Sequence, residues 1–359
     1  MLFKINENKY SSIHSIWLVN ILLFAVAFCA CNRAPKLLAP NRSFYYWKSV
    51  FTLNEYEKKT SQALKATTIY LKYFDVDWDD VLNKPIPKAI LQVSDTSFLM
   101  NPAIELVPTV FITNECMLKI NESQVAEFAE KIKKLLEDVS FKNFSKKSIK
   151  EIQIDCDWSA ASRAKYFALL RLLKMNLKLE KLSATIRLHQ VKYFAKSGIP
   201  PVDKGLLMCY NMGNLKNPSA HNSIIDAAEF KKYMGNLGSY PLPLDIALPL
   251  FSWQVVFSNN LFKGLLHQLP KDSLHSSFSL KNGDQFEIVK DTIVMGYELK
   301  KGDVIRNEES QVEEIIKVGA MLASKLPVVR RQLILFHLDS VTLKKYSVYE
   351  LENIYNSLH

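Results

Sequence analysis

Two aspartates stand two residues apart at the end of an apolar run, in "EIQIDCDWSAASRAKYFALL", residues 151–170. Side chains two apart in a strand point to the same face of a sheet, so Asp155 and Asp157 would project together. Such a pair could act as an acid and its electrostatic partner, bind a metal ion, or form the polar rim of a barrel. A structural role is also open: one aspartate caps the helix expected near Ser162, and the other pairs with Arg187.

The segments around this stretch alternate between strand-like and helix-like patterns. Apolar runs separated by amphipathic ones are typical of parallel strands joined by right-handed crossovers. The eight expected strands are residues 44–51, 68–78, 106–114, 151–158, 181–190, 204–212, 243–253 and 331–341. The sequence therefore predicts an α/β fold, a single (β/α)8 TIM barrel over residues 43–359 with a small β insertion near 255–300. An open doubly wound sheet is the alternative, but no glycine-rich nucleotide-binding motif supports it.

Polar and aromatic residues gather where the expected strands end. Barrel active sites lie at this C-terminal end of the strands. Aromatic faces stack on sugar rings, while carboxylates, amides and guanidinium groups bind hydroxyls. We therefore predict a carbohydrate site with Asp157 as the acid and Asp155 as its electrostatic partner. The residues expected to bind the substrate are Trp47, Asp75, Asp77, Asn114, Arg187, His189, Tyr210, Asn211, Trp253, His337 and Asp339.

Three of the strand ends, "IQIDCDW", "LLMCYN" and "IALPLFSW", resemble motifs of glycoside hydrolase family 18, the chitinase-like barrels. Asp155 and Asp157 match the two later aspartates of that family's D-x-x-D-x-D-x-E motif. Ile152 stands in place of the first aspartate, and Ser159 stands in place of the catalytic glutamate. Because the family's general acid is absent from its usual position, the resemblance does not imply the family's activity for this chain.

The strand-six motif of the same family, Met-x-Tyr followed by Asp or Asn, is matched by Met208, Tyr210 and Asn211. The resemblance implies that Asp157 approaches Tyr210 in the barrel mouth, and that the partner is a polysaccharide or oligosaccharide. The mature chain also resembles an uncharacterised bacterial family, domain of unknown function 3142, in "QIDCDW" and in the barrel layout. That second resemblance implies a fold and no known reaction.

Three functions remain open at this point. The first is a glycoside hydrolase that uses another acid, because crowded carboxylates raise one another's pKa values. The second is a non-catalytic glycan-binding protein, which the serine at position 159 favours. The third is a metal site built from the strand-end aspartates with His189 and His337, but the sequence has no dense histidine cluster. We therefore predict neither a metal nor another cofactor.

The N-terminus resembles a bacterial lipoprotein signal. A polar lead precedes the apolar run "IWLVNILLFAVAF", which is too short for a membrane span of about 20 residues. Ala30 precedes Cys31, so we expect residues 1–31 to be a signal peptide with lipidated Cys31 and residues 32–42 to be a tether. No aspartate follows Cys31, so the outer membrane of a Gram-negative cell is the expected location. An ordinary signal anchor is the alternative.

The charge pattern and the cysteine content bear on nucleic-acid binding and on disulfide formation. The net charge of +10 is spread over segments of mixed sign, and no basic tract interleaved with aromatics suggests nucleic acid. Besides the expected lipid anchor, Cys116, Cys156 and Cys209 form an odd set, so we expect no disulfide framework. Cys156 and Cys209 fall inside expected strands and should be buried.

Overall fold

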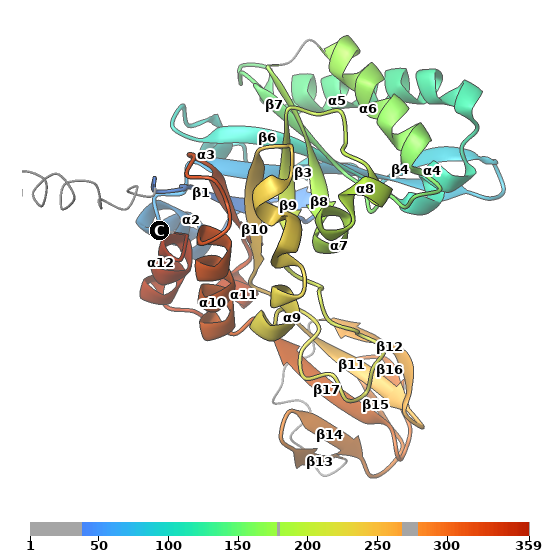
Figure 1. The fold of residues 1–359 in the computed structure, drawn as a ribbon, viewed down its shortest axis with the longest axis vertical. Helices are drawn as coiled ribbons and strands as arrows, with labels where there is room; N and C mark the ends of the chain where they lie inside the picture. The colour runs from blue at the N-terminus through green and yellow to red at the C-terminus, as the bar shows by residue number, and fades with distance from the viewer. Residues whose placement is uncertain (1–37, 178–179, 268–278, 359) are drawn as a thin grey trace, which may run out of the picture. The chain divides into compact units, whose positions relative to one another are not determined.

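The computed structural model describes residues 38–177, 180–267 and 279–358; the expected signal peptide and Cys31 lie outside them. Within the described residues, eight parallel strands form a closed barrel with helices outside it (Figure 1). The barrel strands are β1 (Asn41–Tyr46), β3 (Thr68–Asp79), β6 (Glu105–Ile112), β7 (Glu151–Asp155), β8 (Lys181–Arg187), β9 (Lys204–Met208), β10 (Leu244–Pro249) and β18 (Gln332–Phe336). The predicted (β/α)8 barrel is confirmed.

Strand β1 closes the barrel because it pairs in parallel on both of its edges. Phe44 lies opposite Ile69 of β3 on one side and opposite Leu335 of β18 on the other. Most apolar side chains along these strands are buried, with Phe111 and Phe336 partly exposed at the strand ends. Closure brings the C-terminal ends of all eight strands to the same end of the barrel.

The long outer helices follow from their apolar spacing. In α5, for example, Val125, Phe128, Ala129, Ile132 and Leu136 are buried, and their spacing of three or four residues puts them on one face. The longer helices of the described chain are α2 (Glu55–Ala63), α5 (Val125–Phe144), α6 (Arg163–Leu177), α10 (Val312–Ala323) and α12 (Val348–Asn356). Shorter ones are α3 (Ser97–Met100), α4 (Asn114–Lys119), α7 (Leu188–Lys192), α8 (Phe194–Ser197), α9 (Ala227–Lys231) and α11 (Ser340–Leu343). None of the helices in the described residues is both long and apolar enough to span a membrane.

The strand–helix alternation is weakest between β3 and β6, where the connection contains only the one-turn helix α3. Strand β3 continues into an antiparallel hairpin with β4 (Lys84–Lys88), and β5 (Gln92–Val93) pairs with β2 (Val50–Phe51). Pro85 and Pro87 explain part of this departure, because proline interrupts helices and is tolerated on an edge strand.

The β insertion follows the seventh barrel strand, and it is wider than expected. An antiparallel sheet contains β11 (Ser252–Ser258), β12 (Leu261–His267), β13 (Ser279–Asn282), β14 (Gln285–Ile288) and β17 (Val304–Glu309). A separate hairpin joins β15 (Thr292–Val294) to β16 (Tyr297–Leu299). Val256, Phe286, Ile288 and Ile305 form part of a small apolar core of its own. The insertion thus begins directly after β10 and returns to the barrel just before α10.

Thiol and charged groups are buried in the barrel as well as apolar ones. Cys116, Cys156 and Cys209 are free and buried, which confirms the burial predicted for Cys156 and Cys209. The Lys204 ammonium lies 2.8 Å from a Glu151 oxygen and 2.6 Å from an Asp245 oxygen, and all three side chains are largely shielded from solvent. One lysine of β9 therefore compensates two buried carboxylates, one from β7 and one from β10.

We predict that Lys204→Met lowers the free energy of unfolding by about 3 kcal/mol or more, since it leaves two buried carboxylates without their cation. Chemical denaturation of both proteins would measure the loss. Lys174→Met is the matched control, because the Lys174–Asp203 ion pair is half exposed and should contribute about 1 kcal/mol or less. Equal small losses in the two variants would contradict the assigned role of Lys204.

Candidate functional site

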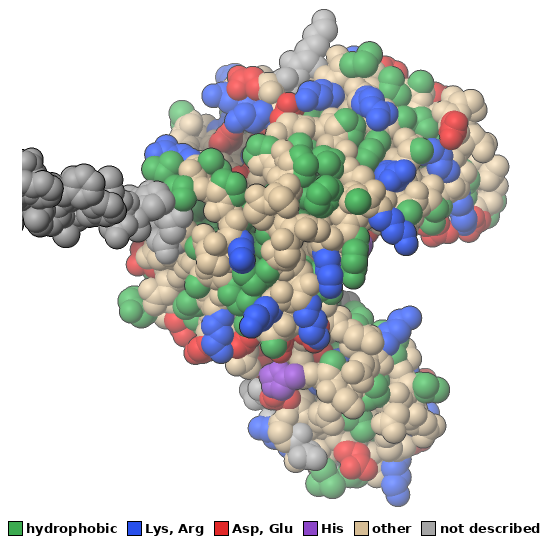
Figure 2. Space-filling model, in the orientation of Figure 1, with side chains coloured by type: hydrophobic (Ala, Val, Ile, Leu, Met, Phe, Trp, Pro, Cys, Tyr) green, Lys and Arg blue, Asp and Glu red, His purple; other side chains and the backbone are tan. Residues whose placement is uncertain are grey.

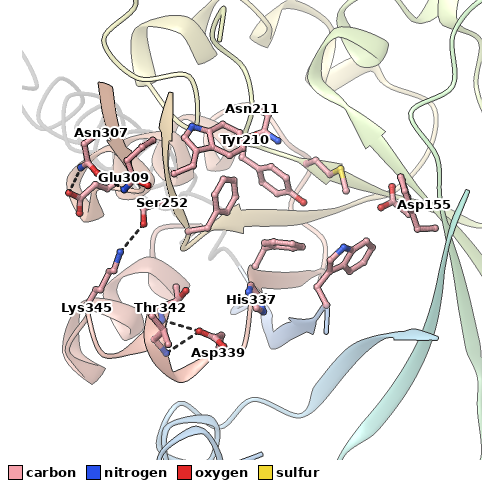
Figure 3. A pocket seen from close by; sticks show the side chains of 18 of the residues that line it. Asp155, Tyr210, Asn211, Ser252, Asn307, Glu309, His337, Asp339, Thr342 and Lys345 are labelled. Atoms are coloured by element: carbon pink, nitrogen blue, oxygen red, sulfur yellow. Dashed lines mark hydrogen bonds between the residues drawn. The ribbon is translucent and has the colours of Figure 1, made fainter. Parts of the chain in front are cut away.

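A cavity of about 890 Å3 lies at the C-terminal ends of the barrel strands and extends to the insertion. Its apolar lining consists of Trp47, Phe111, Met208, Tyr210, Phe251, Trp253, Phe336 and Val341. Its polar lining consists of Asp155, Asp157, Arg187, Asn211, Ser252, Gln254, Asn307, Glu309, His337, Asp339, Thr342 and Lys345. In Figure 3, Asp155 lies at one side, Asn307 and Glu309 lie at the other, and Tyr210 lies between them.

One phenylalanine joins the aromatic rings of this cavity. The Phe336 ring centroid lies 5.7 Å from that of Trp47 and 5.8 Å from those of Tyr210 and Phe251. The Phe251 ring in turn lies 5.3 Å from Trp253. These separations are in the range of favourable aromatic contacts, so the rings fix one another in a continuous apolar wall.

Asp155 is the buried member of the aspartate pair. It ends β7, and its carboxylate accepts a hydrogen bond of 2.6 Å from the Thr185 hydroxyl of the next strand. Burial, and after it the negative charge of Asp157, raises the pKa of Asp155 to about 6. A carboxylic acid that keeps its proton in mildly acidic solution therefore lines the cavity. Cys156, between the two aspartates, is buried and outside the lining.

Asp157 is held by an arginine from the neighbouring strand. Both of its carboxylate oxygens accept hydrogen bonds from the Arg187 guanidinium, one from Nε and one from Nη2. This two-pronged geometry fixes the orientation of both side chains. Of the two structural roles considered for the aspartates, the ion pair with Arg187 is present. The other role is absent, since Asp155 binds Thr185 and does not cap a helix.

His337 and Asp339 follow the last barrel strand and have different surroundings. Burial lowers the pKa of His337 to about 4, so its ring is neutral near pH 7, and Nδ1 has no hydrogen-bond partner in the described residues. Asp339 caps α11 by accepting from the amides of Val341 and Thr342, and it pairs with Lys48. Although burial opposes it, the Lys48 ammonium holds the pKa of Asp339 below its usual value.

A second cavity of about 370 Å3 adjoins the first and holds His189. The two cavities share Asp157, Arg187, Asn211 and Trp253 in their linings. His189 lines only the smaller cavity, so it lies beside the main cavity and not within it. Among the shared residues, Asn211 has a φ of 54°, a left-handed conformation that asparagine tolerates better than most residues.

Asp75 and Asp77 lie outside both cavities. Asp75 accepts a 2.9 Å hydrogen bond from Lys72, whose ammonium lies 5.6 Å from the centroid of the Trp47 ring. Asp77 accepts from Lys88 at 2.9 Å and from the Thr113 hydroxyl at 3.1 Å. Both side chains of β3 thus have protein partners, and Asp75 influences the cavity through Lys72.

Asn114 and the serine at the expected glutamate position are also used elsewhere. The Asn114 side chain accepts a 2.6 Å hydrogen bond from the Ser162 hydroxyl. Ser159 interacts with the same Ser162, and its carbonyl accepts from the Arg163 amide at the start of α6. Position 159 therefore belongs to a helix start, and neither residue lines either of the two cavities described above. Among the described residues, no three His, Cys, Asp or Glu side chains are grouped as metal ligands.

The insertion contributes more of the cavity lining than Trp253, its one predicted site residue. Gln254 of β11 and Asn307 and Glu309 of β17 line the cavity, and the Asn307 amide donates to Glu309 at 2.8 Å. Asn307 and Glu309 are two residues apart, the spacing that places side chains on one face of a strand. That spacing could have marked them, but nothing in the local sequence shows that β17 returns to the barrel mouth.

We predict that Asp155→Asn changes how stability depends on pH. The unfolded carboxyl ionises near pH 3.8 and the folded one near pH 6, so the folded protein binds the extra proton between these values. Asp155 therefore makes the wild type lose stability as pH rises through this window, by roughly 1 to 3 kcal/mol. The variant lacks this loss.

Unfolding free energies measured from about pH 3.5 to about pH 7.5 would test this prediction. The difference between the two proteins should grow through the window and stay constant above it. A difference that does not change with pH would contradict a raised pKa at Asp155.

Comparisons with known proteins add the fold relatives of the chain. No model of a protein family matches the sequence, and no curated protein matches it. Membership of domain of unknown function 3142 therefore stays a prediction.

Solved structures do match. A chitinase from Chromobacterium violaceum aligns with a TM-score of 0.53 at 11% identity, covering 89% of this chain and 98% of that one. The spore cortex-lytic enzyme SleL of Bacillus megaterium aligns with 0.53 at 10% identity, over 90% and 75% of the two chains. The Group IV chitinase of Ostrinia furnacalis aligns with 0.51 at 10% identity, over 89% and 99%. At these identities the likeness shows the fold alone: this chain has the (β/α)8 barrel of chitinase-like enzymes.

Proposed function

We propose that the barrel mouth binds a carbohydrate, a polysaccharide or oligosaccharide of the cell surface or the environment. The cavity has room for several sugar rings and is lined by aromatic faces next to amide, carboxylate and guanidinium groups. Apolar walls with a few oriented polar groups are typical of small-ligand sites. Structures of the same fold include chitinases, which supports this class of ligand.

One hydroxyl carries this proposal. Tyr210 lines the cavity and is buried, yet its hydroxyl has no hydrogen-bond partner among the described residues. A buried hydroxyl without a partner costs free energy, so it is expected where a ligand supplies the missing bond. Asp155, with its pKa of about 6, lines the same cavity and adds a second group able to donate to a ligand oxygen in mildly acidic solution.

We predict that Tyr210→Phe weakens carbohydrate binding about tenfold and leaves the melting temperature unchanged or higher, since one hydrogen bond to the ligand is lost. Calorimetric titration with chitin, cellulose and peptidoglycan oligosaccharides would measure the affinity. Tyr166→Phe is the matched control, because the Tyr166 hydroxyl on α6 is also buried, has no hydrogen-bond partner within residues 38–177, 180–267 and 279–358, and lies outside the cavity. Equal affinities for all three proteins would remove Tyr210 from the site.

Hydrolysis is the second candidate, and the pKa of Asp155 favours it. General acids of glycosidases are protonated at the working pH, and glycosidases ordinarily use two carboxyl groups. Asp155 meets the first need, but Arg187 engages both oxygens of Asp157. Binding without cleavage therefore fits the geometry better. An assay for reducing ends on the same oligosaccharides separates hydrolysis from binding without cleavage. Hydrolysis by the wild type would release reducing ends, and Asp155→Asn would abolish that release.

We also propose that Cys31 carries a lipid that anchors the protein in the outer membrane of a Gram-negative cell. The support is the short apolar run and the Ala30–Cys31 pair, both outside the described residues. We predict that Cys31→Ser abolishes metabolic labelling with a fatty-acid probe and shifts the protein from the detergent phase to the aqueous phase. Partitioning like that of the wild type would exclude this anchor.

A further inference from the structure

Trp253 occupies a special position, because it belongs to the lining of both cavities. It is the second residue of β11, at the start of the insertion, and the centroid of its ring lies 5.3 Å from that of Phe251. A ring whose orientation is already fixed contacts a ligand at a lower cost in side-chain entropy than a mobile one. The side chains that hold it are therefore as important as the ring itself.

Glu308 of β17 holds the Trp253 ring. The indole Nε1 donates a 2.7 Å hydrogen bond to Glu308 Oε2, and the Ser223 hydroxyl donates to the same oxygen. Glu308 is 1% exposed, so its carboxylate is shielded from competing water. Trp253 and Glu308 lie directly opposite each other on paired strands, which puts both side chains on one face of the sheet.

Arg306 in turn fixes Glu308. Its Nε donates to Glu308 Oε1 at 2.7 Å, and Arg306 is likewise 1% exposed. Its Nη1 donates to the carbonyl of Asn217 at 2.7 Å, and its guanidinium carbon lies 5.0 Å from the centroid of the Phe257 ring. Arg306 thus connects the insertion to the segment between β9 and α9, which lines the smaller cavity with Gly213, Leu215 and Ser223.

We propose that Glu308, held by Arg306, is a positioning residue that fixes Trp253 as a stacking surface shared by two adjoining sugar sites. This inference rests on the proposed carbohydrate function and extends it. A buried ion pair is costly and is retained where its groups are fully hydrogen-bonded. Here each partner has a second task, since Glu308 binds the indole and Arg306 binds backbone carbonyls. Ligand length is the specificity that follows: an oligosaccharide long enough to occupy both cavities beside Trp253 binds more tightly than a short one.

The test compares Glu308→Ala, Glu308→Gln and Asp303→Asn in the whole protein. Asp303 is the matched control, because it is a carboxylate of the same insertion and is also 1% exposed. It pairs with the Lys263 ammonium at 2.8 Å, and it lines neither cavity. The first readout needs no ligand: the indole 1H–15N resonance of Trp253, assigned with Trp253→Phe. We expect Glu308→Ala to shift this resonance strongly, Glu308→Gln to shift it less because an acceptor oxygen remains, and Asp303→Asn to leave it in place.

The second readout is the affinity for chitobiose and chitotetraose by calorimetry. We expect Glu308→Ala to weaken chitotetraose about tenfold and chitobiose much less, and Asp303→Asn to change neither. An unshifted Trp253 resonance in Glu308→Ala would overturn the positioning role, and so would a shift with unchanged affinity. Absence of binding to the wild type would instead count against the carbohydrate function for this sugar, while the resonance still decides whether Glu308 holds the ring.

Discussion

The parallel pairing of β1 with both β18 and β3 is the constraint on which the rest of this molecule depends. On one edge it places Phe44, near the start of the described chain, opposite Leu335, near its end. On the other edge it places Phe44 opposite Ile69 of β3. Without it the sheet would stay open, and the polar strand ends would be spread along an edge. With it they surround one cavity, and aromatic rings from separate strands meet at Phe336.

The same closure explains how one strand produces two carboxylates of different character. Asp155 still lies within the barrel wall, where burial disfavours its ionised form. Asp157 lies two residues farther along, beyond the end of β7, where the side chain is half exposed and Arg187 can reach it. A displacement of two residues along a strand thus separates a group that keeps its proton from one that is held as an ion pair.

Much of the architecture could be predicted, because strand and helix periodicity are local properties of the sequence. The barrel, the insertion after its seventh strand and the strand-end residues Asp155, Tyr210 and His337 at the cavity follow from patterning and order. The sequence offered an ion pair of one aspartate with Arg187 as an alternative, but it could not decide that Asp157 makes this pair, because that depends on the register of β7 against β8. The return of β17 to the barrel mouth could not be predicted, since it depends on antiparallel pairing with β11 that no short window records. The reduction of the helix between β3 and β6 to the single turn α3 belongs with these, since the antiparallel hairpin with β4 comes first.

The insertion also has a consequence for how the chain finds its fold. Ser252, at its start, is paired with Glu309, at its end, and the Ser310 amide donates to the Phe251 carbonyl at 3.1 Å. The two ends of the insertion therefore lie side by side, so the insertion connects β10 to α10 as a tight turn would. Once β11 and β17 have paired, bringing β10 against β18 closes a much shorter effective loop, and each halving of loop length reduces the entropy cost of closure by about 0.6 kcal/mol. A large addition can thus be carried at the mouth while the chain entropy of closing the barrel stays close to that of a barrel without it.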